Sequence, residues 1–321
     1  MLQGAKRILF FGSDEFSVIC CNRLLRASKE GVVSNLEIVT PPDNPRTKQP
    51  EVPLKRFARE NSIPHHLAPP KTLTGWTPPT SFDLAVVVSF GYFLPSAVIG
   101  AFPLRALNVH PSLLPKYRGA APIQHTILNG DTKTGVSIME LDEKKFDAGR
   151  ILHQSSLDVG PYPFYKELHD RLAVQGAEDL VKTVSKLHEL KEHAWLQNLD
   201  EVTHARKIET AMSAIDWAAM SREFIYSRHR ALGYKTPLYC QFREKRVQIL
   251  SMTLQNSTME LPADASPGSL VYDKEASILF VKCQDGWIGV DSLKVAGKKD
   301  LNAKAFFNGY QLTLRDQFVP A

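Results

Sequence analysis

The feature that most constrains the fold is a regular alternation of short apolar runs and helix-like segments in the amino-terminal part of the chain. Apolar runs typical of strands occur at residues 7–11, 36–40, 84–89, 106–110 and 135–139. Residues 84–88 (LAVVV) are apolar on both faces, as expected for a strand buried within a parallel sheet. Helix-like segments lie between these runs at residues 16–27, 52–61 and 123–128. This alternation predicts an α/β fold with a doubly wound, Rossmann-like and mostly parallel sheet.

The carboxyl-terminal part has a different pattern. A long amphipathic helix is predicted over residues 165–192, followed by a polar stretch at 198–214. After a helix at 218–230, five short β-rich runs follow at residues 238–242, 247–253, 269–272, 278–283 and 287–293. We therefore expect one domain over 1–197, a linker at 198–214 and a smaller second domain over 215–321. Five short strands favour a small β-barrel, of which an OB-like barrel is one kind.

Composition narrows the functional classes. The chain has 321 residues, 43% of them hydrophobic and 23% charged, which is typical of a soluble globular protein long enough for two domains. A formal net charge of +5 is compatible with an anionic partner. Cys20, Cys21, Cys240 and Cys283 show no metal-ligand spacing, so we expect reduced thiols and no metal. No apolar run approaches the ~18 residues of a membrane span, and no membrane partner is expected.

The run NVHPSLLP at residues 108–115 carries candidate catalytic groups. Asn108 and His110 are two residues apart, so on a strand over 106–110 both side chains leave the same face. The prolines that follow cannot continue a central strand, which places the pair at the strand's carboxyl end, where α/β sheets bind ligands. Together with Asp147, they provide an amide, an imidazole and a carboxylate that can act on a carbonyl group. A purely structural role, with His110 closing a strand and Asn108 forming a turn, is the alternative.

Two longer segments carry a family resemblance. NVHPSLLPKYRGAAPIQ at residues 108–124 and FDAGRIL at residues 146–152 resemble the catalytic domain of the folate-dependent formyltransferases, and within them the methionyl-tRNA formyltransferases. The resemblance covers nearly the whole chain, including IDW at residues 215–217. It implies an enzyme that transfers a formyl group from 10-formyltetrahydrofolate to the amino group of methionyl initiator tRNA, giving formylmethionyl-tRNA for translation initiation. It also implies that the second domain is an OB-like, tRNA-binding barrel.

The resemblance suggests roles for the three candidate catalytic residues. Asn108 would donate a hydrogen bond to the oxyanion that forms when an amine attacks the formyl carbon. His110 would hydrogen-bond that oxyanion or relay the amine's proton. Asp147 would orient His110 and hold a water molecule, and the direct proton acceptor stays open.

In this family the pterin is bound largely by the backbone of two loops. The matching residues here are Phe90, Gly91 and Tyr92, with Phe93 and Leu94 beside them, and Glu140, Leu141 and Asp142. Ser112, Leu113, Leu114 and Pro115 are expected to line the same cavity. For Phe90, Tyr92 and Phe93, plain core packing is the alternative.

The residues expected to contact tRNA are more scattered. Arg46 and Lys48 lie on a proline-broken loop at residues 40–50, which in the methionyl-tRNA formyltransferases enters the acceptor end of the tRNA. Here the loop is shorter and less glycine-rich than in bacterial relatives, and Asn44 stands where an arginine is expected. Lys207 matches a family lysine near the tRNA, and Lys294, Lys298, Lys299 and Lys304 form a basic cluster suited to phosphate contacts. A solvated charged face is the alternative for that cluster.

This altered loop, with the divergence at residues 226–239, favours a mitochondrial matrix enzyme, with a bacterial cytoplasmic one as the alternative, and we expect a monomer. Two other functions are compatible with part of the pattern. The first is a formyltetrahydrofolate hydrolase or a formyltransferase for a small amine, which would lack the basic second domain. The second is a non-enzymatic RNA-binding module, which has no chemical need for Asn108, His110 and Asp147 together.

Overall fold

The computed structural model describes residues 4–45, 51–313 and 315–321. The chain divides into two compact units. The first comprises residues 1–123, 132–160 and 167–207, and the second comprises 124–131, 161–166 and 208–321. Within the described residues, no helix combines the length and the apolarity needed to span a lipid bilayer.

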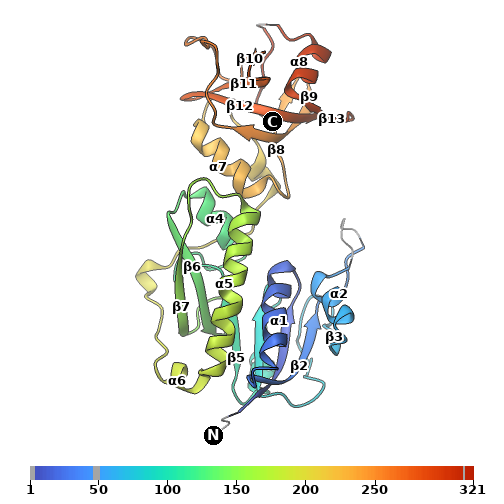
Figure 1. Cartoon of the computed structure of the whole chain (residues 1–321), viewed down its shortest axis with the longest axis vertical. Helices are drawn as coiled ribbons and strands as arrows, with labels where there is room; N and C mark the ends of the chain where they lie inside the picture. The colour runs from blue at the N-terminus through green and yellow to red at the C-terminus, as the bar shows by residue number, and fades with distance from the viewer. Residues whose placement is uncertain (1–3, 46–50, 314) are drawn as a thin grey trace. The chain divides into compact units, whose positions relative to one another are not determined.

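The first unit is built around a seven-stranded sheet with the strand order β3-β2-β1-β4-β5-β6-β7 (Figure 1). The strands β3, β2, β1, β4 and β5 are parallel to their neighbours in this order, whereas β6 pairs antiparallel with both β5 and β7. The strands are β1 (Lys6–Gly12), β2 (Val33–Thr40), β3 (His65–Leu67), β4 (Leu84–Val88), β5 (Ala106–His110), β6 (Lys133–Glu140) and β7 (Ile151–Asp158). The prediction of a mostly parallel, doubly wound sheet is confirmed, and β3 and β7 extend it.

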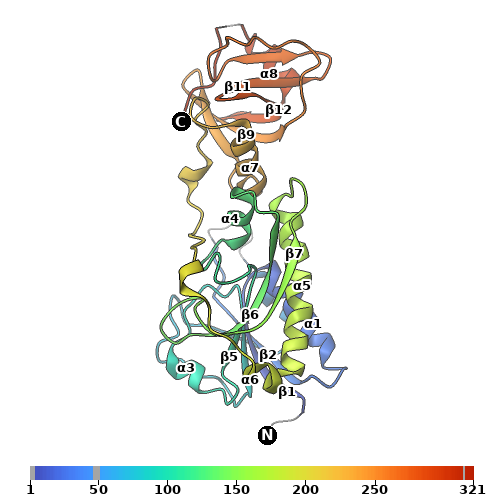
Figure 2. The same ribbon diagram turned by 90° about the vertical axis from the view of Figure 1, so that its left-hand side faces the viewer.

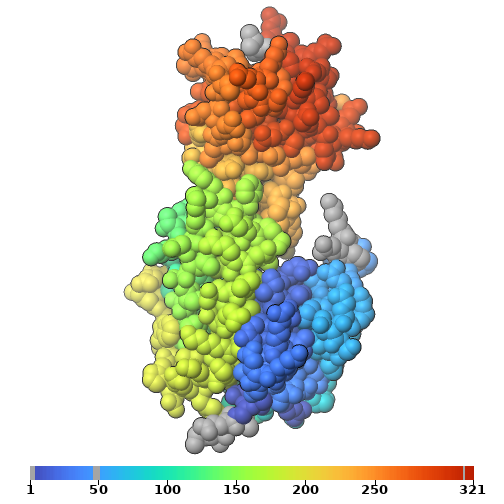
Figure 3. All heavy atoms as spheres, in the orientation of Figure 1, coloured from blue at the N-terminus to red at the C-terminus, as the bar shows by residue number. Residues whose placement is uncertain are grey.

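Helices cover both faces of this sheet. They are α1 (Glu15–Ala27), α2 (Pro53–Glu60), α3 (Ser96–Gly100), α5 (Tyr165–Ser185) and α6 (Leu187–Glu192). Helices α1 and α5 lie side by side on one face, where Arg23 Nε is 2.9 Å from Glu178 Oε1, and Figure 3 shows their surfaces in contact. Helix α3 lies on the opposite face (Figure 2). The single helix predicted over 165–192 is therefore wrong, because the chain breaks at Lys186 into α5 and α6.

One face of the sheet leads directly to the candidate catalytic residues. Leu9, Phe11 and Ala106 from two strands pack with Val98 and Ile99 of α3 in one buried cluster. Side chains alternate along a strand, so Asn108 and His110 leave the same face of β5 as Ala106. The strand order reverses between β1 and β4, next to β5, and open α/β sheets bind ligands beyond the carboxyl ends of the strands at such a point.

The second unit is built on a six-stranded sheet. The path β10-β11-β12-β9-β8 is antiparallel throughout, and β13 pairs with β12. The strands are β8 (Leu238–Phe242), β9 (Lys245–Thr253), β10 (Leu270–Asp273), β11 (Ile278–Cys283), β12 (Gly286–Val295) and β13 (Asp300–Asn302). Helices α7 (Arg222–Leu232) and α8 (Ala303–Tyr310) accompany the sheet, and α4 (Pro122–Leu128) lies mostly within this unit.

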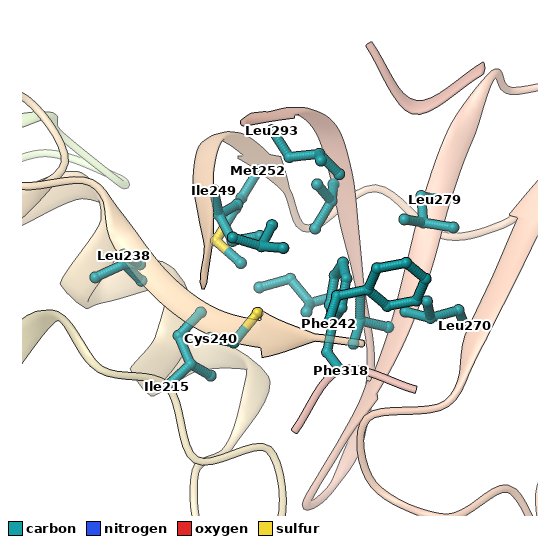
Figure 4. Packing of buried hydrophobic residues seen from close by; sticks show 14 of the residues in the cluster. Ile215, Leu238, Cys240, Phe242, Ile249, Met252, Leu270, Leu279, Leu293 and Phe318 are labelled. Atoms are coloured by element: carbon teal, nitrogen blue, oxygen red, sulfur yellow. The ribbon is translucent and has the colours of Figure 1, made fainter. Parts of the chain in front are cut away.

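The sheet of the second unit encloses its own hydrophobic core. Phe242, Ile249, Leu293 and Phe318 are at most 1% exposed and pack with Cys240 (Figure 4). All four cysteines are free and buried, as predicted for reduced thiols. Burial raises the pKa of the Cys283 thiol to about 11. In the part of the chain that the structure describes, no group of His, Cys, Asp and Glu side chains is arranged to hold a metal ion.

The OB-like barrel expected for the second unit is not confirmed. The named strands form an open path, and no closed barrel occurs among the described residues. The carboxyl-terminal segment nevertheless bridges both ends of the path, because Val319 pairs with Gln241 at the end of β8 and Gln317 pairs with Ser269 just before β10. The two edges are thus joined by single bridges and not by a continuous ladder.

Candidate active site

The candidate site lies at the end of β5. Asn108 is beside Val87 of β4 and Met139 of β6, and is half-buried. His110 is only 4% exposed. The strand stops there because Pro111 has no amide hydrogen for the ladder, and the Ser112 amide turns back to the His110 carbonyl at 2.9 Å. The predicted placement of both side chains on one face at the carboxyl end of the strand is confirmed.

The loop after β6 brings Asp147 to the same place. At its start, the Leu141 amide donates to the carbonyl of Ala106, the first residue of β5, at 2.9 Å. Further along, Asp147 Oδ1 accepts a hydrogen bond from Asn108 Nδ2 at 3.3 Å, and Asp147 Oδ2 accepts one from the Gly119 amide at 2.8 Å. The loop therefore crosses the face of β5 and delivers a carboxylate 39 residues away in sequence to Asn108.

Backbone constraints explain the Asp-Ala-Gly sequence of this loop. A Cβ atom on Gly149 would lie 1.8 Å from the carbonyl oxygen of Glu140, so only glycine allows the two ends of the loop to approach this closely. Asp147 has a φ of +53°, in the left-handed region that Asp and Asn adopt more readily than most residues.

The two ring nitrogens of His110 face different groups. Its Nε2 is 2.9 Å from the carbonyl oxygen of Tyr117, so Nε2 carries a hydrogen and donates it. The other nitrogen, Nδ1, faces Asp147 Oδ1 at 3.7 Å. Nδ1 is therefore the atom at which the ring can gain or lose a proton.

The two loops predicted to bind the pterin meet beside these residues. Tyr92 and Leu141 border the same hydrophobic cluster in which Phe90 is buried. The ring centroids of Phe93 and Phe146 are 5.1 Å apart in an edge-to-face contact. The structure thus brings residues 90–94 and 140–147 together, although they follow different strands and lie about fifty residues apart in sequence.

Phe146 is a residue that the sequence analysis did not single out. Its side chain is 60% exposed, although it is a large aromatic residue directly before Asp147. An exposed aromatic ring next to a buried carboxylate is the signal that would have identified it. Its contact with Phe93 joins the loop that carries Asp147 to the loop that follows β4.

The other residues expected at the folate site have defined partners. Leu114 packs with Met139 and Ile151, and its amide donates to Ser137 Oγ at 3.1 Å. The carboxylate of Glu140 pairs with Arg150 at 2.8 Å, and Asp142 Oδ1 accepts two backbone hydrogen bonds within its own loop. The side chains of Glu140 and Asp142 therefore shape the loop. Ser112 and Leu113 follow β5. Ser112 Oγ donates to the carbonyl of Lys116 at 2.6 Å, so this hydrogen bond spans the segment that contains Pro115.

The basic residues are distributed over several elements. Lys294 lies on β12, Lys298 and Lys299 follow the turn to β13, and Lys304 is in the first turn of α8. We refer to these four residues as the lysine hairpin. Lys294 Nζ pairs with Asp300 at 2.9 Å, whereas the other three are exposed. Lys207 is exposed in the first unit, and Arg46 and Lys48 lie outside the described residues.

Comparison with known proteins gives the family. The description "Formyl transferase" matches residues 6–184, which is more than half of the chain, and "Formyl transferase, C-terminal domain" matches residues 207–311. The chain belongs to the formyl transferase family, and the predicted resemblance is confirmed.

Individual relatives agree with this family. The mitochondrial methionyl-tRNA formyltransferase of Homo sapiens is 38% identical over 313 residues, which cover 95% of this chain and 77% of the human protein. The methionyl-tRNA formyltransferase of Sulfurihydrogenibium sp. is 30% identical over 319 residues, which cover 97% of this chain and 99% of that protein.

Solved structures extend the similarity of the fold. HypX from Aquifex aeolicus, solved in complex with tetrahydrofolic acid, matches with a TM-score of 0.63 at 14% identity. The match covers 96% of this chain and 48% of HypX, so this chain spans about half of HypX's length. At this identity the likeness is one of fold.

Proposed function

We propose that this chain is a methionyl-tRNA formyltransferase that transfers a formyl group from 10-formyltetrahydrofolate to the amino group of methionyl initiator tRNA. The observation that carries the proposal is the convergence of Asn108, His110 and Asp147 at the end of β5. Two relatives with this activity in their names, at 38% and 30% identity over nearly the whole chain, support the choice of substrate.

The residues around the site fit a folate. A pterin ring needs an apolar slot with a few polar groups at its edge. Phe93 and Phe146 supply aromatic surface, and the loops at 90–94 and 140–142 border it, with Gly91 in the left-handed region at a φ of +81°. We assign Phe90, Gly91, Tyr92, Glu140, Leu141 and Asp142 to this site, with Ser112, Leu113, Leu114 and Pro115 beside them. When bound, the folate supplies the formyl group.

The three polar residues have distinct tasks in the transfer. The amine nitrogen forms a bond to the formyl carbon, negative charge develops on the formyl oxygen, and the amine loses a proton. The bond between the formyl carbon and N10 of the donor then breaks, and tetrahydrofolate leaves after N10 gains a proton. One hydrogen of the Asn108 amide is directed to Asp147, which orients the amide so that the other can stabilise that oxygen. His110 exchanges the proton at Nδ1, since Nε2 donates to Tyr117. Asp147 fixes both groups.

We assign residues 1–197 to the catalytic domain, 198–214 to a linker and 215–321 to an OB-like tRNA-binding domain. The family matches over 6–184 and 207–311 support this division, and the bridges from Val319 and Gln317 to the two sheet edges support a barrel-like second domain. Lys294, Lys298, Lys299 and Lys304 would contact tRNA phosphates. Lys207 would contact tRNA from the linker, and Arg46 and Lys48 would guide the acceptor end from the catalytic domain.

The relatives also bear on where the enzyme works. Four relatives named as mitochondrial enzymes are 37–39% identical to this chain, compared with 30–33% for four bacterial ones. We propose a mitochondrial matrix location and a monomer that acts away from membranes. Fractionation of cells expressing the tagged protein and light scattering of the purified chain test these two points.

One assay separates the proposed function from its rivals. The protein is incubated with 10-formyltetrahydrofolate and either methionyl initiator tRNA or free methionine, and formyl incorporation and formate release are measured. Formylation of the charged tRNA is the expected result. Formylation of the small amine alone would support a small-amine transferase, formate release alone a hydrolase, and tRNA binding without reaction a non-enzymatic module.

A further inference from the structure

Residues 197–205, near the end of the first unit, contact the two loops that hold the candidate catalytic side chains. Gln197, which is 7% exposed, donates from Nε2 to the carbonyl oxygens of Asp147 at 3.0 Å and Gly149 at 2.8 Å. Its Oε1 accepts from Arg118 Nε at 2.9 Å and Nη2 at 2.7 Å. Because a guanidinium can only donate, Arg118 fixes which end of the Gln197 amide faces the Asp147 loop.

The same segment also holds the other loop of the site. The Tyr117 amide donates to Thr203 Oγ1 at 2.9 Å, and the Arg118 amide donates to the Thr203 carbonyl at 2.9 Å. The Ala205 amide donates to the Arg118 carbonyl at 2.8 Å. This loop carries the two backbone groups that touch the candidate catalytic side chains, namely the Tyr117 carbonyl on His110 and the Gly119 amide on Asp147.

From this geometry we infer that Gln197 is a positioning residue for the transfer reaction, which acts by holding the Asp147 loop against the loop that follows His110. The inference rests on the proposed function. Asp147 has left-handed backbone geometry, which costs free energy in any residue other than glycine, so contacts that hold the loop offset that cost. Gln197 supplies two of those contacts and links them to Arg118 on the other loop.

Charge supports this arrangement. Burial lowers the pKa of the Arg118 guanidinium, and attraction to Asp147 and Asp142 opposes that shift. The Gln197 amide is neutral. It therefore links the Arg118 cation to the Asp147 backbone without placing a second carboxylate beside that of Asp147. Without Gln197, two buried carbonyls and the guanidinium would each be left without this partner, and Asp147 could move away from Asn108 and His110.

The test compares two glutamine variants of the full chain. Gln197→Met keeps the volume and removes every hydrogen bond of the side chain. Gln175→Met is the matched control, because Gln175 Nε2 donates to Asp179 Oδ1 at 3.1 Å in the same unit, within α5. For each variant, kcat and KM for formyl donor and for methionyl-tRNA are measured, together with the melting temperature.

We expect Gln197→Met to lower kcat by roughly 10- to 100-fold, as misplacement by about 1 Å does in other active sites, with both KM values within twofold to threefold of wild type. Gln175→Met should change kcat less than twofold. Gln197→Glu, which keeps the acceptor for Arg118 but has no donors for the loop, should have a reduced kcat as well. The inference is overturned if kcat is retained in Gln197→Met, if only KM changes, or if the decrease equals that of the control. A failure of the proposed function is distinguished by the wild-type protein. If the wild type transfers no formyl group, the proposed function fails and this inference fails with it; if the wild type is active, the variants test the inference alone.

Discussion

The end of β5 and the lysine hairpin differ in how firmly their side chains are held. At the end of β5, Asn108, His110 and Asp147 are fixed by each other and by the backbone of Tyr117 and Gly119. In the lysine hairpin, three of the four side chains are exposed, while Lys294 forms an ion pair with Asp300. Bond making needs groups aligned to within a fraction of an ångström, whereas phosphate neutralisation needs only a charge within reach. The two regions are therefore suited to different parts of one reaction.

The largest effect is expected from Asn108→Ala. If the site depends on fixed geometry, removing the amide eliminates an oxyanion donor and should lower kcat by about 100-fold or more, or roughly 3 kcal/mol of barrier. The melting temperature should change little, because the side chain is half-buried and makes one long hydrogen bond. Asn35→Ala is the control, since the Asn35 amide also donates to a carboxylate, that of Glu37, from a strand of the same sheet. Wild-type kcat in folded Asn108→Ala would remove Asn108 from the reaction.

The second-largest effect is expected from Asp147→Asn, which should lower kcat by roughly 10- to 100-fold. Asp147 accepts hydrogen bonds at both carboxylate oxygens, so an amide in its place must point an NH₂ group at another donor. The change also removes the negative charge that faces His110 Nδ1. Steady-state kinetics over a range of pH measure the effect. Asp83→Asn is the control, because Asp83 Oδ2 also accepts a backbone amide, that of Arg7, but away from the site. An unchanged rate and pH profile would mean that Asp147 has no electrostatic role.

Gly149→Ala tests whether the loop backbone is as constrained as its side chains. The added methyl group would lie 1.8 Å from the Glu140 carbonyl oxygen, so the loop must move and Asp147 with it. Overpacking of this kind costs about 1–3 kcal/mol of stability, and kcat should fall with it. Thermal unfolding and kinetics of Gly149→Ala are compared with those of Gly100→Ala, where the nearest atom, on Arg105, is 3.9 Å from the new methyl group. If the two variants have equal melting temperatures and equal kcat values, the loop adjusts to the added methyl group without displacing Asp147.

Sequence alone predicted the parts of this site that depend on local rules. Alternation along β5 placed Asn108 and His110 on a common face, and Pro111 marked the point at which the strand ends. The apolar run at 84–88 predicted a buried strand, now seen as β4. These features depend on neighbours in sequence, which is why they could be inferred without a structure.

The rest of the site depends on contacts that local patterns do not encode. Gln197 is 50 residues from Asp147 and lies just before the polar stretch at 198–214, so nothing marked it as a buried partner of that loop. Phe146 became notable only once its exposure was known. The break at Lys186 falls within an amphipathic pattern and has no Pro or Gly to predict it. The barrel was inferred from the number of strands, but closure depends on how the carboxyl-terminal segment pairs with the two sheet edges.

The smallest effects are expected in the lysine hairpin, and they sharpen the comparison because its members differ. Lys298→Gln should weaken tRNA binding for all sequences, and it should lower the slope of log K against log salt by roughly 0.7 to 0.9 if Lys298 neutralises one phosphate. Lys294→Gln should change the slope less, because Asp300 already neutralises part of the Lys294 charge. Binding of methionyl-tRNA is measured between about 50 and 200 mM salt, and folate affinity serves as the control that should not move. If Lys294→Gln and Lys298→Gln give equal slopes, the ion pair does not persist in the complex. If both slopes equal that of wild type, the hairpin is a solvated surface and the tRNA is bound elsewhere.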